Sequence, residues 1–246
     1  MINTILFDLD GTLLAFDQNE FIKLYFAGIE EKFLHHGYPK GVVLNAVFEG
    51  VKAMLANDGS ISNEQAFWDR FSVFLPDQLY FFEKEFLDYY QTDFNEIKKI
   101  VKENEYAHKA IKVLKEKNYQ LVLATNPLFP QVATYNRIKW GDLNKNDFSL
   151  ITTFENSSFC KPNPKYYLEI LEKINKNPNE CMMVGNDVEE DLVAAKLGID
   201  TYLITDNIIN SQNLDYSMHK NGSFKDFYEF TLTLKDLWKG FIIVIW

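Results

Sequence analysis

The feature that most constrains this chain is the stretch from Ile5 to Leu14, where an apolar run leads into two aspartates and a glycine. Two carboxylates separated by one residue at the end of a buried strand repel each other. Burying both therefore raises the pKa of one of them or requires a cation. Residues i and i+2 of an extended strand share one side, so Asp8 and Asp10 can reach the same reacting group. Gly11 lets the backbone approach a phosphate closely, and Thr12 offers a hydroxyl and an N–H to phosphate oxygens. The stretch predicts a phosphate site, although a strand ending in a solvated acidic turn is the simpler alternative.

Length and composition restrict the class of protein. A chain of 246 residues can bury a full core and hold one or two domains. Its formal net charge of -10 argues against a nucleic-acid partner, which needs a basic face, but permits an anionic substrate if a cation is bound. Two cysteines, Cys160 and Cys181, make no disulfide framework, and neither a signal peptide nor a membrane-length apolar run is present. We therefore expect a cytoplasmic protein with no membrane partner, its oligomeric state left open.

A change of periodicity divides the chain. From residue 16 to about 92, apolar residues recur at helical spacing in four segments, and capping boxes begin two of them, at Asp17 and at Ser62. Short apolar strands then alternate with helices, which is typical of a parallel sheet covered on both faces. Strands are expected at 2–8, 120–126, 148–154, 181–185 and 201–205, and helices at 104–118, 130–139, 163–175, 189–197 and 224–232.

These patterns predict an α/β fold with a Rossmann-like parallel sheet, helices on both faces and an inserted all-helical domain. The core would comprise residues 1–15 and 93–246, and the helical cap domain residues 16–92. Residues 206–222 are expected to form a loop. The apolar run 241–246 is expected to be an edge strand or a covered tail, with no assigned function.

Polar residues follow the expected strands at four places. In such sheets ligands bind outside the carboxyl ends of the strands. The four clusters are Asp8 with Asp10, Thr125 with Asn126, Lys161, and Asn186 and Asp187 with Asp191. Each alone also suits a polar turn, a surface lysine or acids at a helix start. Their joint occurrence in sequence order predicts one composite site.

The motifs resemble those of the haloacid dehalogenase superfamily of hydrolases, in particular its phosphatases with a helical cap inserted after the first motif. Asp8-Leu9-Asp10-Gly11-Thr12 matches the first motif, Asp-x-Asp-x-Thr. Thr125 matches the Ser/Thr of the second motif, Lys161 the lysine of the third and Asp187 the acid of the fourth. The resemblance covers residues 4–14 and about 104–206.

The fourth motif departs from the family pattern. Many relatives have Gly-Asp at its start, whereas this chain has Gly185-Asn186-Asp187. Asp187 is expected to be the metal ligand, but the register could differ by one residue. Asp191 or Asn186 therefore stays open as a further contributor to the metal site.

The resemblance implies a Mg²⁺-dependent phosphatase that hydrolyses a small phosphate monoester through an aspartyl-phosphate. Asp8 would attack phosphorus, and Asp10 would protonate the leaving alcohol and then deprotonate water. Mg²⁺ would be held by the Asp8 carboxylate, the Asp10 carbonyl and Asp187. Lys161 would offset charge in the transition state. Thr12, Thr125 and Asn126 would contact the substrate phosphate.

Other activities of the same superfamily remain open from the sequence. A sugar phosphomutase would share the Asp8 chemistry, and a non-catalytic phosphate-binding regulatory protein would keep the fold. A phosphonate-cleaving enzyme would need a cap lysine, for which Lys23 is available, although a solvated helix lysine is the simpler interpretation. A dehalogenase is disfavoured because its reaction does not require Asp10.

Overall fold

The computed structural model describes residues 1–237, whose core is a six-stranded parallel sheet in the order β3-β2-β1-β4-β5-β6. Along the chain the strands are β1 (Thr4–Phe7), β2 (Gln120–Leu123), β3 (Leu150–Ile151), β4 (Cys181–Gly185), β5 (Asp200–Ile204) and β6 (Lys220–Gly222). The first strand lies in the middle of the sheet, between β2 and β4, and all four of its residues are buried. A strand buried on both faces explains why β1 carries a continuous apolar run.

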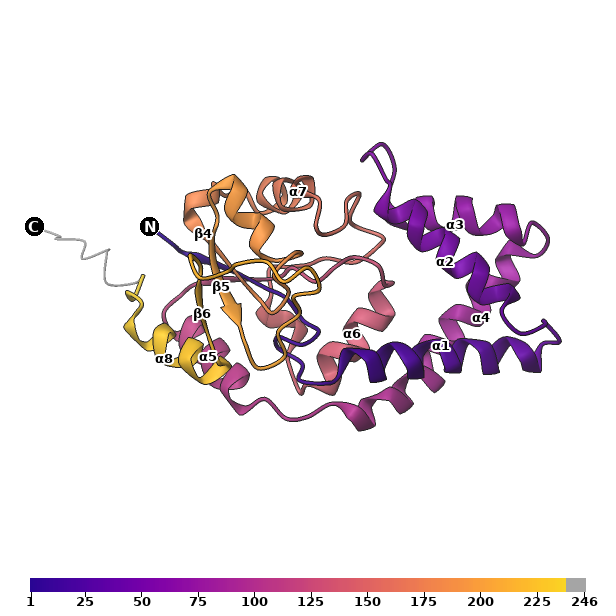
Figure 1. Cartoon of the computed structure of the whole chain (residues 1–246), viewed down its shortest axis with the longest axis horizontal. Coiled ribbons are helices and arrows are strands. Elements are labelled where there is room, and N and C mark those ends of the chain that lie inside the picture. Colours follow the sequence, from indigo (N-terminus) through magenta and orange to yellow (C-terminus); the bar gives the residue numbers. More distant parts are fainter. Residues whose placement is uncertain (238–246) are drawn as a thin grey trace, which may run out of the picture.

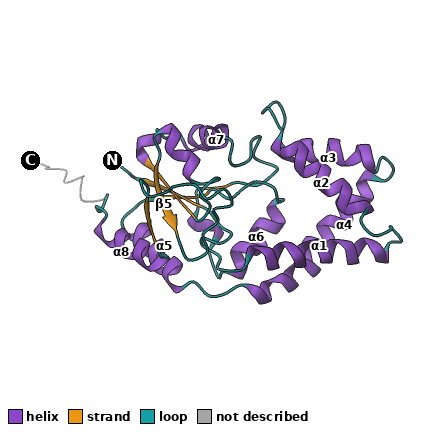
Figure 2. Ribbon diagram, viewed as in Figure 1, coloured by secondary structure: helices purple, strands orange, loops and turns teal. Residues whose placement is uncertain are grey.

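Helices cover both faces of the sheet (Figures 1 and 2). Leu6 of β1 packs into a cluster with α7 (Pro164–Ile174) and the 3₁₀ segment η4 (Leu192–Leu197). Ile5 and Phe7 point the other way, into a cluster with α5 (Glu105–Glu116), α6 (Gln131–Trp140) and α8 (Phe224–Thr233). Alternation along β1 thus supplies two cores, and the predicted α/β Rossmann-like fold is confirmed.

The regular secondary structure between β1 and α5 is helical. It contains α1 (Gln18–His35), α2 (Val42–Leu55), α3 (Asn63–Phe74), α4 (Leu79–Gln91) and the 3₁₀ helix η1 (Asp93–Ile100). Asp17 and Ser62 accept hydrogen bonds at the starts of α1 and α3, as their capping boxes predicted. Figure 1 shows these four α-helices at the end of the molecule away from β6 and α8. The division at residues 15/16 and 92/93 into two domains stays a prediction.

The helical insertion is attached to the core on two sides. Aromatic rings run from α1 through Phe94 of η1 to Trp140 of α6, with the Phe94 and Trp140 centroids 4.8 Å apart. On the far side Asn63, at the start of α3, is fully buried, and its N–H donates to Ser157 O at 2.8 Å. The Glu64 N–H donates to Phe154 O at 2.9 Å. The insertion therefore contacts both the helix layer and the loop that leads to Lys161.

Three local expectations differ from the structure. Residues 206–222 were expected as a loop, but Lys220–Gly222 form β6, which pairs with β5 through its backbone. The strand expected over 148–154 is confined to Leu150–Ile151, and the helix expected over 189–197 is the 3₁₀ segment Leu192–Leu197. Two minor 3₁₀ turns are η2 (Lys145–Asp147) and η3 (Pro178–Glu180). The apolar run 241–246 lies outside the described residues.

None of the helices within residues 1–237 combines the length and the apolar character that crossing a bilayer requires.

Candidate active site

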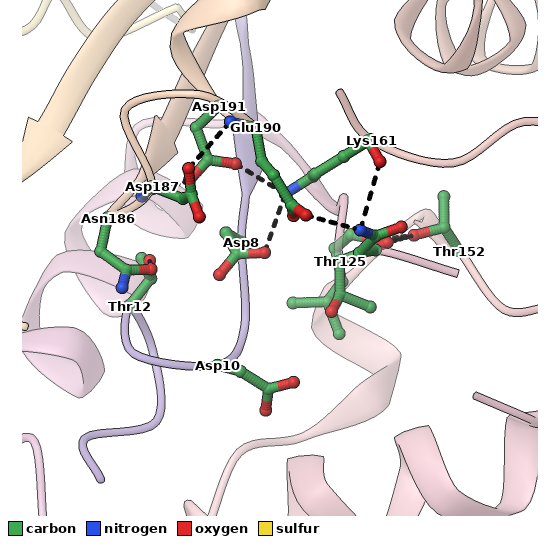
Figure 3. A network of polar contacts seen from close by, with 12 residues as sticks. Asp8, Asp10, Thr12, Thr125, Thr152, Lys161, Asn186, Asp187, Glu190 and Asp191 are labelled. Carbon is green, nitrogen blue, oxygen red and sulfur yellow. Dashed lines mark hydrogen bonds and ion pairs between the residues drawn. The ribbon is translucent and has the colours of Figure 1, made fainter. Parts of the chain in front are cut away.

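The predicted site residues meet at the carboxyl edge of the sheet (Figure 3). Asp8 follows β1, Thr125 follows β2, and Asp187 follows β4. The Asp8 N–H donates to Val184 O at 2.9 Å, which extends the β1–β4 pairing by one residue. This hydrogen bond holds in place the backbone from which the Asp8 side chain projects. Parallel pairing therefore brings together residues that lie more than 170 positions apart.

Lys161 is the central cation of the site. Its side chain is fully buried, and Nζ donates to Asp8 Oδ1 at 2.8 Å and to Asp191 Oδ1 at 2.7 Å. Burial on its own lowers the pKa of Lys161, but the two carboxylates outweigh this and hold the pKa well above its usual value. Lys161 is therefore a permanent positive charge beside Asp8.

The fourth motif gives its two aspartates different surroundings. Asp191 accepts from Lys161 with one oxygen and from the Asp187 N–H with the other, at 2.9 Å. Asp187 is less buried, and its Oδ1 accepts the N–H groups of Glu189 and Glu190 at 2.8 and 2.9 Å. A Cβ on Gly185 would overlap the Asp191 carboxylate, so this position must be glycine for Asp191 to reach Lys161. Asp191 thus holds Lys161, and Asp187 is left to face the cavity.

Asn186 and Thr12 are hydrogen-bonded to each other, and of the two only Asn186 borders the cavity. The Thr12 hydroxyl donates to Asn186 Oδ1 at 2.9 Å, and Asn186 Nδ2 donates to Asn207 O at 2.7 Å. Gly11 has a φ of 83°, and a Cβ there would overlap the Asn186 amide. Asn186 therefore anchors the turn after the first motif. The predicted contact between Thr12 and a phosphate stays a prediction.

Thr125 and Asn126 both border the cavity next to Asp8. The Thr125 carbonyl accepts hydroxyl hydrogen bonds from Thr152 at 2.6 Å and Tyr166 at 2.9 Å, which fixes the loop after β2. The Asn126 side chain donates to Glu190 Oε1 at 3.0 Å. Its Oδ1 is buried and accepts no hydrogen bond within residues 1–237. The structure therefore places both residues on the cavity that Asp8 lines, and their contact with a phosphate stays a prediction.

Arg137 is a site residue that sequence reasoning missed. It is fully buried in α6, forms an ion pair with the Asp10 carboxylate, and its guanidinium lies 4.3 Å from the centroid of the Phe129 ring. Arg137 Nη2 also donates to Thr134 Oγ1 at 3.3 Å. The one signal in the sequence is its position four residues after Ala133, which places an arginine on the apolar face of that helix.

Burial raises the pKa of several acids in the site. Burial raises the pKa of Asp8 to about 7, although Lys161 acts in the opposite direction. The pKa of Asp10 is also raised by burial, against the lowering effect of Arg137. For Glu190 burial raises the pKa to about 8, and it raises that of Asp187 as well. The site therefore holds more carboxylates than its cations neutralise, and a further cation would stabilise their ionised forms.

The donor set suits a hard divalent cation that keeps several waters. Within residues 1–237 no three His, Cys, Asp or Glu side chains are arranged around one point as a complete metal site. The predicted ligands are instead two carboxylates, Asp8 and Asp187, with the backbone carbonyl of Asp10. Mg²⁺ is typically bound by one or two carboxylates and completes its shell with water and substrate phosphate oxygens. The residues present therefore fit Mg²⁺ better than a cation that needs a protein-only cage.

The site opens into a cavity of about 750 Å³ between the sheet edge and the helical insertion. Site residues on its surface are Asp8, Asp10, Thr125, Asn126, Asn186, Asp187, Glu190 and Asp191. A cavity of this volume accommodates a small organic molecule in addition to a phosphate group.

Comparison with known proteins identifies the family. The family model described as haloacid dehalogenase-like hydrolase matches residues 2–198. This chain belongs to the haloacid dehalogenase-like hydrolase family. The family and the enzyme class, a hydrolase, were both predicted from the motifs and are confirmed. The match includes all the predicted site residues, from Asp8 to Asp191.

A curated relative and several solved structures are similar over most of the chain. Pyrophosphatase PpaX of Anoxybacillus flavithermus is 29% identical over 200 residues, which is 79% of each chain. A haloacid dehalogenase-type phosphatase from Thermococcus onnurineus has a TM-score of 0.59 and 19% identity, covering 96% of this chain and 100% of that one.

Two further structures bear on the chemistry of the fold. A 2-haloacid dehalogenase from Pseudomonas syringae has a TM-score of 0.61 at 15% identity, covering 94% of this chain and 98% of that one. YfnB of Bacillus subtilis, whose structure is bound to magnesium, has a TM-score of 0.54 at 18% identity, with 94% and 98% covered. Phosphatases and a dehalogenase share this fold, so the fold alone does not define the reaction.

Proposed function

We propose that this protein is a Mg²⁺-dependent phosphatase that hydrolyses a small phosphate monoester through an aspartyl-phosphate on Asp8. The observation that carries the proposal is the buried Lys161, whose Nζ lies 2.8 Å from Asp8 and 2.7 Å from Asp191, two carboxylates that line the cavity. A buried ammonium beside a carboxylate nucleophile fits a reaction in which two anions, the carboxylate and a phosphate, must come together. Two of the similar proteins, a pyrophosphatase and a phosphatase, carry out phosphoryl chemistry, which agrees with the proposal.

The proposed reaction has two steps. In the first, an Asp8 oxygen forms a bond to phosphorus while the bond from phosphorus to the alcohol oxygen breaks, and Asp10 gives its proton to that oxygen. In the second, a water oxygen attacks phosphorus as the bond to Asp8 breaks, and Asp10 takes the proton of the water. The products are the alcohol and inorganic phosphate. Burial shifts the pKa of Asp10 in the direction of the protonated form that the first step requires, whereas Arg137 acts in the opposite direction.

Several residues would position the phosphate in this reaction. Lys161 would face a phosphoryl oxygen as well as Asp8 and would balance charge in the transition state. Thr125 and Asn126 line the same cavity. The Thr125 hydroxyl would donate a hydrogen bond to another phosphoryl oxygen, and Asn126 would contact the phosphate beside it. Arg137 would hold the Asp10 carboxylate in position. Asp191 would act through Lys161 without touching the substrate.

Magnesium would be held by the Asp8 carboxylate, the Asp10 carbonyl and the Asp187 carboxylate. When bound, it would neutralise charge on the phosphate and on Asp8. Asp8 attacks only in its ionised form, whereas burial favours protonation, so a cation in addition to Lys161 would favour the reactive form. Magnesium in the YfnB structure is consistent with this assignment for the family. The substrate would be a small phosphorylated metabolite in the cytoplasm.

The test compares two variants in an assay of inorganic phosphate release. Asp8→Asn is expected to abolish turnover in a folded protein, because a carboxamide is a poor nucleophile. Asp10→Asn is expected to reduce the rate about 10²–10⁴-fold, because Asp8 still attacks without an acid to assist the leaving alcohol. Release of free phosphate separates this activity from that of a phosphomutase, which returns the phosphoryl group to a sugar. Substantial phosphate release by folded Asp8→Asn would contradict the proposal.

A further inference from the structure

The walls of the cavity beside Asp8 include an exposed apolar surface contributed by three helices of the insertion. Ile22 of α1, Phe48 of α2 and Leu87 of α4 all line the cavity and are 41%, 41% and 47% exposed. Exposed apolar side chains are normally scattered singly, whereas a convergent group marks a binding surface. These three side chains are not part of the buried hydrophobic core, so they are available to contact a ligand in the cavity.

The deeper walls of the cavity are aromatic. Phe21, Tyr25, Phe67 and Tyr90 are nearly buried and border the cavity from α1, α3 and α4. The hydroxyls of Tyr25 and Tyr90 are 2.7 Å apart and hydrogen-bond to each other, so the ring surfaces dominate what this wall offers. Such a lining favours an apolar or aromatic group over a polar one.

The charges around the cavity oppose an anionic leaving group. Of the described residues that line the cavity none is Lys, Arg or His, whereas Glu64, Glu83 and Glu155 are among them. The cations behind the site are already paired, Lys161 with two aspartates and Arg137 with Asp10. A second phosphate or a carboxylate on the leaving group would lose water against aromatic rings and would face glutamates without a counter-charge.

From these walls we infer that the substrate is a phosphate monoester of an uncharged, largely apolar or aromatic alcohol. Its phosphate would lie at Asp8, and the alcohol portion would extend past Asp10 into the cavity between α1, α2 and α4. This inference rests on the proposed phosphatase activity. It separates this chain from a pyrophosphatase, whose leaving group is itself a phosphate.

The test uses a matched pair of substrates. The phosphate esters of 3-phenylpropanol and 4-hydroxybutanoate both release a primary alcohol, and they differ in ending with a phenyl ring or a carboxylate. We expect kcat/KM to favour the phenyl ester by about tenfold or more, since a group that fits an apolar pocket gains at least this factor. Equal values, or preference for the carboxylate ester, would overturn the inference.

Acetyl phosphate, a small reactive phosphate, separates failure of the inference from failure of the proposed function. If the enzyme with Mg²⁺ hydrolyses acetyl phosphate but not the phenyl ester, the inference about the cavity is wrong while phosphatase activity stands. If none of the three compounds is hydrolysed, the proposed phosphatase function fails and the inference fails with it.

Matched surface variants test whether the named wall residues are responsible. Phe48→Ser should reduce kcat/KM for the phenyl ester about tenfold relative to kcat/KM for acetyl phosphate. Phe74→Ser is the control, because Phe74 is similarly exposed, at 43% against 41%, but does not line the cavity. If both variants lose phenyl-ester activity equally, or if neither loses it, the assignment of this wall is wrong.

A charge variant tests the electrostatic part of the inference. Glu83→Lys should narrow the preference for the phenyl ester over the carboxylate ester about tenfold, because it places a cation at the cavity wall. Glu172→Lys changes the net charge equally from an exposed position on α7 that does not line the cavity, and it should leave the preference unchanged. If the two variants behave alike, the charge of the cavity wall does not select the substrate.

Discussion

Replacing Arg137 with methionine should lower the free energy of unfolding by about 3 kcal/mol at pH 8. Methionine is flexible enough to fill much of the space, so the main loss is the charge opposite Asp10. Removing one partner of a fully buried ion pair costs about 3–5 kcal/mol. The Arg137 side chain is 1% exposed but that of Asp10 is 23% exposed, which places this pair at the lower end of the range.

The loss of unfolding free energy in Arg137→Met should depend on pH, and the titration of Asp10 determines whether it grows or shrinks as pH falls. Burial already raises the pKa of Asp10 above its usual 3.8, and Arg137 opposes that rise, so the variant should raise the pKa further. A carboxyl group whose pKa is raised by folding destabilises the folded state at high pH, and this effect disappears as pH falls below the pKa in the unfolded chain. The difference between wild type and variant should therefore shrink from pH 8 to pH 5.

Urea unfolding followed by tryptophan fluorescence at both pH values measures this difference. Arg70→Met is the control, because Arg70 pairs with Glu49 at the surface with 44% of its side chain exposed. Loss of such a pair costs less than about 1 kcal/mol. The double variant with Asp10→Asn should recover about 2 kcal/mol of the loss, since no charge is then left unpaired. A cost for Arg137→Met no larger than for Arg70→Met, or one independent of pH, would refute the reasoning.

The remaining predictions concern the fourth motif and the metal. Asp187→Ala should raise the Mg²⁺ concentration for half-maximal activity about tenfold or more, whereas Asp191→Ala should mainly lower kcat at saturating Mg²⁺ because it frees Lys161. Mg²⁺ titrations of both variants measure this, and the opposite order would reverse the two assignments. Gly185→Ala, whose Cβ would overlap the Asp191 carboxylate, should reproduce the kcat defect of Asp191→Ala with an unchanged Mg²⁺ requirement. A chelator should abolish activity and added Mg²⁺ restore it; full activity in chelator would contradict the metal assignment.

The central strands could be predicted because burial on both faces demands a continuous apolar run. The expected strand at 181–185 coincides with β4, and that at 201–205 differs from β5 by one residue at each end. The edge strand β6 could not be found, since Lys220-Asn221-Gly222 pairs through its backbone and has little apolar character to recognise. The 3₁₀ segments could not be predicted either, because side-chain spacing does not reliably distinguish them from one turn of α-helix.

The site was predictable where its residues follow strands and unpredictable where they come from elsewhere. Asp8, Thr125 and Asp187 meet because parallel strands end at one edge, and their motifs show where each strand ends. Arg137 reaches Asp10 from the body of α6, a contact set by tertiary packing rather than by any local pattern. Asp191 was a candidate for the metal, but only the structure shows its two oxygens bonded to Lys161 and to the Asp187 N–H.

The Asp10–Arg137 pair also bears on which reaction this fold performs. The fold is shared by solved phosphatases and by a 2-haloacid dehalogenase, so it does not choose between phosphoryl transfer and dehalogenation. Burying an arginine costs free energy that an apolar side chain of similar size would not. Here the buried Arg137 orients the Asp10 carboxylate toward the cavity that Asp8 also lines. Dehalogenation does not require an acid at this position, whereas release of an alcohol from a phosphate ester does, so the costly pairing supports the proposed phosphoryl transfer.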